Sequence, residues 1–348
     1  MSYPPTFGLE RPMNGFRVGL SADFCDDQGK LVFPDIGLSL LDGFPELSYC
    51  FIPKYEAEYL PEQLEIKYLG MYPVVTDSID GYMGSDWRGN IAFNGNSVRA
   101  DGMQSKWYPV LYDIKTNKRY ENVKYDLSLN CDDCTVLFVN GSVPVMGNSA
   151  HLVSDLPREM AIFCGNFKTA ENNGVWLLNS GMTKEDQQKL FKIANTYQAY
   201  YSKKFDIPFK GNLTFLHAGT VADPKEWGFN FYANPTTFNV AAGEFSLASF
   251  FNSANSTKNK QTMAHELAHY YFGTMLKSGD EFGHVMEEGF AEYLSLNLTR
   301  NLEGEKPYHE LLKNKLEKLA NLHNYKPFLL IKTEADYGNR EYYLSSYC

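Results

Sequence analysis

The first half of the chain consists of short β-prone runs separated by Gly, Asn, Asp and Pro. Runs of this length, rich in Val, Ile, Phe and Tyr and bounded by turn residues, are typical of strands. The runs are FRVGLSADF, LEIKYLGMYPVV, NIAFNGNSVRA, WYPVLYDI, KYDLSLN, TVLFVNGS and EMAIFCGNF. They predict an amino-terminal, antiparallel β-sandwich-like or barrel-like domain over residues 1–180.

After residue 180 the hydrophobic pattern takes a helical period. The segment SGMTKED is a capping-type start for QQKLFKIANTYQAYYSKKF, where apolar residues recur at helical spacing up to Pro208. Next come two β-like runs and three helical segments: NLTFLHAG, TFNVAAGEF, NKQTMAHELAHYYFGTML, HVMEEGFAEYLSLNLTR and YHELLKNKLEKLANLH. This order predicts an α+β protein whose second domain covers residues 181–348.

Composition and charge argue against several function classes. The 348 residues are 44% hydrophobic, which is enough for a sizeable core and for two domains. The 32 Lys and Arg against 42 Asp and Glu give a net charge of -10, so neither nucleic acid nor a membrane surface is an expected partner. No run approaches the roughly 20 apolar residues of a membrane helix, and a soluble chain is expected. Oligomeric state stays open.

Six cysteines are too few and too scattered for a disulfide scaffold. They favour a reducing compartment, hence the cytoplasm, while secretion or a periplasmic location stays open if a signal peptide was removed. Cys131 and Cys134 form a lone CxxC between two β-like runs. A hairpin turn or an incidental pair is favoured there over a redox or metal role.

The motif with the clearest chemistry is His265-Glu266-Leu267-Ala268-His269. A separation of four places both imidazoles on one face of a helix, where they reach one tetrahedral cation, with Glu266 beside them as a general base. The alternative for the motif alone is a pair of helix histidines with ordinary hydrogen bonds.

A third ligand strengthens the metal interpretation. Eighteen residues separate His269 from Glu288, which stands in the segment VMEEGFAEY. Three protein ligands leave the fourth position of a zinc ion to water, as in catalytic rather than structural sites. The sequence therefore predicts one Zn²⁺ per chain and hydrolysis by a zinc-activated water.

HExxH, eighteen residues and a Glu within an EGFA segment resemble the signature of the aminopeptidase N family of gluzincin peptidases. The segments NGNSVRADGMQSKWYPVLYD, LFVNGS and EMAIFCGNF are similar to parts of that family's β-domain. The resemblance implies a β-rich domain followed by a thermolysin-like catalytic domain with a small sheet and helices. Val285 and Met286 stand where the family usually has Trp. The chain stops at Cys348, so the family's carboxy-terminal helical part is expected to be absent and the chain to be a fragment or a minimal form.

The resemblance also implies a tyrosine about sixty residues beyond the last ligand that stabilises the oxyanion, and a second one five positions earlier. Tyr347, 59 residues after Glu288, and Tyr342 fit these positions. The tail also offers Tyr337 and Tyr343, and a structural role for Tyr347 stays open.

Three further residues near the motif receive different interpretations. Glu292 follows Glu288 by one helical turn, so its carboxylate is placed to accept the free N–H of a zinc-bound histidine; an exposed helix carboxylate is the alternative. Glu287 points elsewhere on a helix and is expected in solvent. His284 has no partner at ligand spacing and is expected at the surface.

The run Ala241 to Phe245 resembles in position the family's Gly-Xaa-Met-Glu-Asn strand, whose Glu grips the substrate's free amine. Glu244 would take that role if an edge strand presents it to the cleft; a surface glutamate is the alternative. The expected function is therefore a zinc aminopeptidase acting on peptides with a free amino terminus. A thermolysin-like endopeptidase and a non-catalytic binding module remain alternatives.

Overall fold

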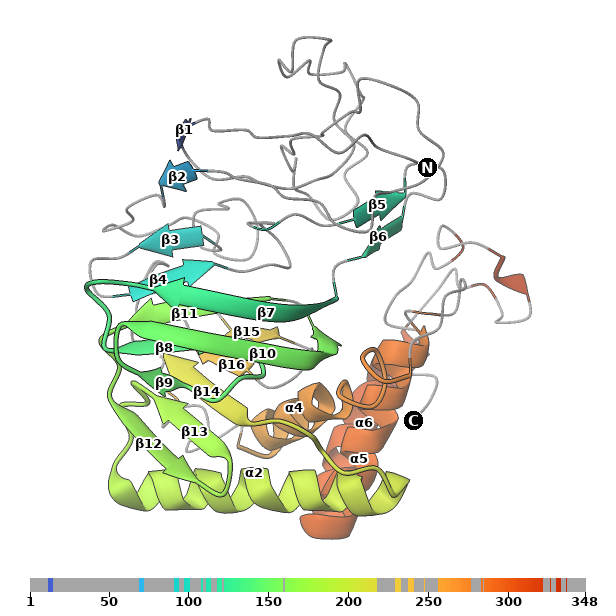
Figure 1. The fold of residues 1–348 in the computed structure, drawn as a ribbon. Coiled ribbons are helices and arrows are strands. Elements are labelled where there is room, and N and C mark those ends of the chain that lie inside the picture. Colours follow the sequence, from blue (N-terminus) through green and yellow to red (C-terminus); the bar gives the residue numbers. More distant parts are fainter. Residues whose placement is uncertain are drawn as a thin grey trace.

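The computed structural model describes residues 122–158, 160–217, 229–232, 237–240, 256–276 and 285–321, with short strands between residues 12 and 120 and a few single positions. This part of the protein is mixed α/β, with small sheets and several helices (Figure 1). None of the helices found in it is long and apolar enough to cross a membrane.

Before residue 166 the described elements are antiparallel strands, except for one short parallel pair. A five-stranded sheet has the order β3 (Ile91–Phe93), β4 (Ser97–Ala100), β11 (Ile162–Gly165), β8 (Val136–Val139) and β9 (Val145–Met146). Separate two-stranded pairs are β7 (Val123–Asn130) with β10 (Ser149–Arg158), β5 (Leu111–Asp113) with β6 (Lys118–Tyr120), and the parallel pair β1 (Pro12–Asn14) with β2 (Leu69–Met71). The β-rich character predicted for this half is therefore present.

The helices pack against a second five-stranded sheet. Its order is β12 (Thr169–Asn172), β13 (Val175–Leu178), β14 (Leu213–His217), β16 (Thr237–Val240) and β15 (Phe229–Tyr232). The three inner strands are parallel, whereas β12 and β15 pair antiparallel at its two edges. Because β12 and β13 precede residue 180, the sheet takes strands from both sides of the predicted domain boundary, and the division at 180 stays a prediction.

Alternate residues of this sheet face two different cores, as the period of two in a strand requires. Leu177 and Phe215 lie in the cluster that includes the helices, while Leu178 and Leu216 pack with residues of β8 and β11. Thr237 at the start of β16 also donates a hydrogen bond to buried Asn140 Oδ1 at 2.7 Å. The sheet is thus the middle layer between the helices and the first β-region.

Four α-helices and one π-helical segment are described after residue 180: α2 (Lys184–Phe205), α4 (Ser256–Ala268), η2 (Val285–Gly289), α5 (Phe290–Leu302) and α6 (Glu305–Ala320). The predicted capping start is present, because Thr183 Oγ1 accepts the backbone N–H of Asp186 at 3.2 Å. α2 contacts β13 and α4, α4 packs on α5, and α5 packs on α6 (Figure 1).

The pattern missed several strands whose exposed faces are polar. The longest is β10, in which buried and exposed positions alternate along SAHLVSDLPR. Its outward Ser, His and Asp residues and Pro157 weaken the β signal, although the strand is fixed by pairing with β7. The strands β1, β6, β9, β12, β13 and β15 were also not predicted, while the run FRVGLSADF lies outside the described residues.

Candidate metal centre

The two histidines of HExxH meet at the end of α4. His265 lies in the last turn of the helix, whereas His269 follows its last residue, Ala268, in a tight turn that the His269 N–H closes onto the Glu266 carbonyl at 3.2 Å. The ring centroids are 4.8 Å apart, with the ring planes at 83°. The spacing of four therefore brings the imidazoles together even though the regular helix ends between them.

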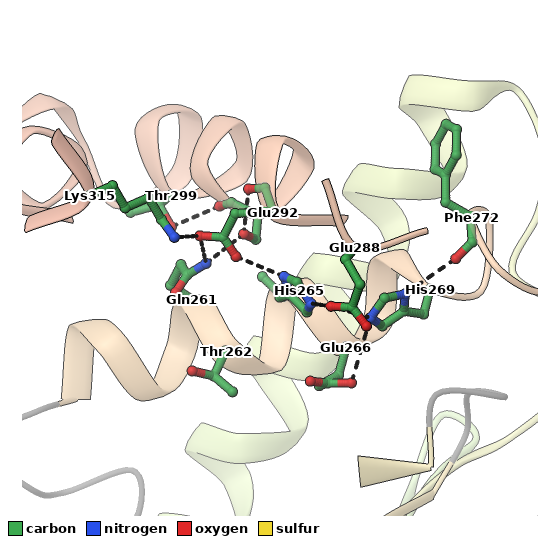
Figure 2. A network of polar contacts seen from close by, with 12 residues as sticks. Gln261, Thr262, His265, Glu266, His269, Phe272, Glu288, Glu292, Thr299 and Lys315 are labelled. Atoms are coloured by element: carbon green, nitrogen blue, oxygen red, sulfur yellow. Dashed lines mark hydrogen bonds and ion pairs between the residues drawn. The ribbon is translucent and has the colours of Figure 1, made fainter. Parts of the chain in front are cut away.

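Glu288 approaches both imidazoles from η2. Its Oε2 lies 3.3 Å from His265 Nε2 and 4.0 Å from His269 Nε2. Figure 2 shows the carboxylate between the two rings. The segment that carries it is π-helical, a form that often occurs as a short insertion next to a functional site.

These three side chains fit a metal ion. Ligand atoms on a tetrahedron with bonds of about 2.1 Å lie roughly 3.4 Å from one another. The distance from Glu288 Oε2 to His265 Nε2, 3.3 Å, is close to this value, and the distance to His269 Nε2, 4.0 Å, is longer. Two imidazole nitrogens and one carboxylate oxygen are ligands typical of zinc.

A second grouping competes for the third position. Ligand atoms of His265, Glu266 and His269 lie within 4.8 Å of one another, and Glu266 Oε2 is 4.0 Å from His269 Nε2. We favour Glu288 because the same oxygen approaches both Nε2 atoms. Glu266 then lies beside the site, as Figure 2 shows, where its carboxylate stays available as a base.

The predicted contact between Glu292 and a histidine is present in the structure. Glu292 Oε2 lies 2.8 Å from His265 Nδ1, and Oε1 accepts hydrogen bonds from Gln261 Nε2 at 3.0 Å and from Lys315. With only 7% of its surface exposed, Glu292 is not an exposed helix carboxylate. The sequence analysis did not identify Gln261 and Lys315 as partners of Glu292. The only sign of such a role in the sequence was that Gln261 stands four residues, about one helical turn, before His265.

Glu287 differs from its prediction. It is half-buried rather than in solvent, and its Oε1 lies only 2.5 Å from where a Cβ on Gly273 would be. The prediction assumed α-helical angles, whereas η2 has a π-helical turn that rotates the side chain toward the loop after α4.

Burial and charge act in opposite directions within the cluster. Burial lowers the pKa of His265, but hydrogen bonds to Glu288 and Glu292 outweigh it and raise that pKa to about 10. Burial raises the pKa of Glu266 to about 7 against the opposing charge of His265. Burial also raises the pKa of Glu292, yet the contacts with His265 and Lys315 lower it to about 2. The site concentrates carboxylates around two imidazoles, which favours a cation.

The second histidine has a different support. His269 is 3% exposed, and its Nδ1 lies 3.3 Å from the backbone carbonyl oxygen of Phe272. That carbonyl belongs to the turn after α4, in which the Gly273 N–H bonds to the Leu276 carbonyl at 2.9 Å.

Other predicted site residues lie outside the described residues: Tyr342, Tyr347, Glu244 and His284. Their roles stay predictions. The described strand before Glu244, β16, lies between β14 and β15 rather than at an edge of its sheet, and residues 241–245 lie outside the described part of the chain.

Cys131 and Cys134 form a disulfide in the turn that leads from β7 to β8. The pair lies in a turn, but the hairpin interpretation is wrong; among the described residues no His completes a metal site there. The turn joins two different sheets rather than two paired strands.

Comparisons with known proteins find likeness in structure but not in sequence. No protein-family description and no curated protein matches the chain. A leukotriene A4 hydrolase from Saccharomyces cerevisiae is similar at 14% identity over 72% of this chain and 40% of its own length, with a TM-score of 0.48. An M1 zinc metallopeptidase from Deinococcus radiodurans has 12% identity over 71% of this chain and 55% of its own length, with a TM-score of 0.45. Aminopeptidase A from Legionella pneumophila has 16% identity over 60% of this chain and 26% of its own length, with a TM-score of 0.42. The chain thus spans between about a quarter and just over half of these proteins, and the proposal below is argued from the site itself.

Proposed function

We propose that this protein is a zinc metallopeptidase. The observation that carries the proposal is the convergence of His265 Nε2, His269 Nε2 and Glu288 Oε2, with the Glu266 carboxylate 4.0 Å from His269 Nε2. Two imidazoles and one carboxylate with a second carboxylate alongside suit hydrolysis, because they hold a metal and leave a base next to it.

The number of protein ligands supports a catalytic rather than a structural site. Structural zinc sites are closed by four protein ligands. Glu292, a buried carboxylate of this cluster, is engaged by Gln261, Lys315 and His265 Nδ1, so it is not a fourth ligand. The three remaining ligands leave one position for water or substrate.

The chain's own groups have separate tasks in this proposal. A bound zinc ion would supply a Lewis acid that polarises the scissile carbonyl and acidifies water. Glu266 would accept a proton from the attacking water at its carboxylate and pass it to the leaving amine. Glu292 would hold the Nδ1 proton of His265 and so leave Nε2 free to ligate.

The finer proposal is that the enzyme is an aminopeptidase, with Glu244 binding the substrate amine, Tyr347 stabilising the oxyanion and Tyr342 assisting. It rests on the resemblance of the sequence to the aminopeptidase N family and not on the described geometry. The endopeptidase alternative uses the same zinc chemistry but needs no amine anchor.

A zinc assay combined with a peptide panel tests the proposal. Protein purified without added metal should carry about one zinc per chain and should cleave aminoacyl anilides or short peptides. Glu266→Gln should keep zinc and lose nearly all turnover, because the amide cannot accept the proton. A wild-type chain that binds no zinc contradicts the proposal. Equal cleavage of free and amino-acetylated peptides contradicts only the aminopeptidase part.

A further inference from the structure

Three helices meet at the carboxylate of Glu292, which belongs to α5. Its Oε2 contacts His265 Nδ1 of α4 at 2.8 Å, while its Oε1 accepts from Gln261 Nε2 of α4 at 3.0 Å and from Lys315 Nζ of α6. In Figure 2 these groups form a continuous line that starts at Lys315 and ends at the two histidines. Both oxygens of the carboxylate are therefore occupied.

The amide of Gln261 is itself fixed. Its Nε2 also donates to Ser295 Oγ at 2.7 Å, and this hydroxyl donates to the Glu292 carbonyl at 2.7 Å. Gln261 is 7% exposed and Ser295 is fully buried, so water does not compete with these bonds. Satisfied buried networks of this kind hold side chains in one arrangement.

The orientation of His265 follows from this network. A carboxylate carries no proton, so the 2.8 Å contact makes Nδ1 a donor to Glu292 and leaves Nε2, the nitrogen that faces Glu288, as the one that would lose its proton to a metal ion. A carboxylate free to rotate would hold the imidazole less firmly. Groups that fix the carboxylate therefore act on the ligand, although they do not touch the metal position.

We infer that Lys315 and Gln261 are positioning residues of the metal centre, which act through Glu292 on His265 and make α6 part of the site. The inference rests on the proposed function, because it presupposes that the centre binds zinc. It extends the site to a helix outside the HExxH and EGFA segments.

The direction in which zinc affinity changes on removal of Lys315 distinguishes a positioning role from a purely electrostatic one. The ammonium repels a dication by Coulomb interaction, so removal of its charge alone would strengthen zinc binding. Loss of an anchor on Glu292 would weaken it. Weaker zinc binding after removal of Lys315 is therefore the result that positioning predicts and electrostatics alone does not.

The test is the zinc dissociation constant of the full chain, measured by competition with a chelator of known affinity, for wild type, Lys315→Met and Gln261→Met. We expect both variants to bind zinc about tenfold more weakly, at the low end of the effect of losing a group that supports a ligand. Lys315→Arg, which keeps a charged donor, should stay closer to wild type. Lys313→Met is the matched control, because this lysine on the same helix is 76% exposed and pairs only with exposed Glu317 among the contacts described for it.

Two further readouts distinguish the outcomes. The visible spectrum of the cobalt-substituted proteins reports ligand geometry, and the melting temperature of the zinc-free proteins reports stability. Unchanged or tighter zinc binding by Lys315→Met, with a lower melting temperature, would overturn the inference and leave Lys315 a purely structural residue. If Lys315→Met does not fold, the zinc affinity and melting temperature of Gln261→Met decide in the same way. A wild-type chain without zinc affinity refutes the proposed function, whereas a wild type that binds zinc but cleaves no peptide leaves this test intact.

Discussion

The two histidines of the site are supported in contrasting ways. His265 depends on side chains from three helices, since Glu292 holds its Nδ1 and is held in turn by Gln261 and Lys315. His269 lies with its Nδ1 3.3 Å from the backbone carbonyl of Phe272, only three residues along the chain. One ligand is thus set by contacts distant in sequence and the other by a local turn. Side-chain substitutions should perturb the first, and backbone strain should perturb the second.

Removal of either imidazole should have the largest effect on zinc affinity, and this effect should not depend on how the histidine is supported. His265→Ala and His269→Ala should each lower zinc affinity by roughly a thousandfold or more, because one of three protein ligands is lost. Chelator competition measures this. His309→Ala is the control, since this histidine is exposed on α6. Full zinc retention by His265→Ala would refute the ligand assignment.

Gly273→Ala tests the local turn that carries His269. Gly273 has a φ of +105°, and an added Cβ would lie 2.5 Å from Glu287 Oε1. Strain and the clash together should cost about 3 kcal/mol of stability. The Glu287 side chain must move, and because Glu287 adjoins the candidate ligand Glu288, zinc affinity should fall as well.

Gly304→Ala provides the matched control for that experiment. Gly304 has a φ of +104° but no atom within 4 Å of its would-be Cβ, so only the backbone strain of about 1 kcal/mol should remain. Chemical denaturation of the zinc-free proteins measures both. Equal losses in the two variants would show that Glu287 does not constrain the turn.

The sequence predicted the residues that follow a fixed helical or motif spacing better than the other residues that support the site. HExxH and the spacing to Glu288 identified the three candidate ligands, and the spacing of four predicted the approach of Glu292 to a histidine. Such spacings work because helical geometry fixes which residues share a face.

Lys315 was not predicted, because nothing in local spacing tells which residue of α6 reaches α5. Gln261 was missed although it stands one helical turn before His265 on α4. Glu287 was placed in solvent because α-helical angles were applied to a π-helical turn. The polar strand β10 was missed for a related reason, since its pairing with β7 rather than its own composition makes it a strand.

Glu292→Gln tests the distant support of His265. The amide keeps the shape, but it replaces one acceptor oxygen by a donor and removes the charge that pairs with Lys315. Zinc affinity should fall by about 10- to 100-fold, with the cobalt spectrum altered. Glu310→Gln on the exposed face of α6 is the control. If Glu292→Gln leaves zinc affinity unchanged, Glu292 does not support His265 as a ligand.

The smallest expected effect concerns α2, which separates overall stability from metal binding. Thr183 caps this helix, and its Oγ1 accepts the backbone N–H of Asp186 at 3.2 Å. Thr183→Ala should cost about 1 kcal/mol, the usual cost of losing an N-cap. Thr196→Ala is the matched control, since Thr196 is exposed inside the same helix, where Ala is the better helix former. Neither variant touches the support of His265 or of His269, so the zinc affinity of both should equal that of wild type. If Thr183→Ala weakened zinc binding as much as Glu292→Gln does, zinc affinity would simply follow the stability of the fold. The different supports of the two histidines would then not explain it. An unchanged dissociation constant at a lowered unfolding free energy would instead show that the contacts around each imidazole, and not the stability of the whole fold, determine how the metal is held.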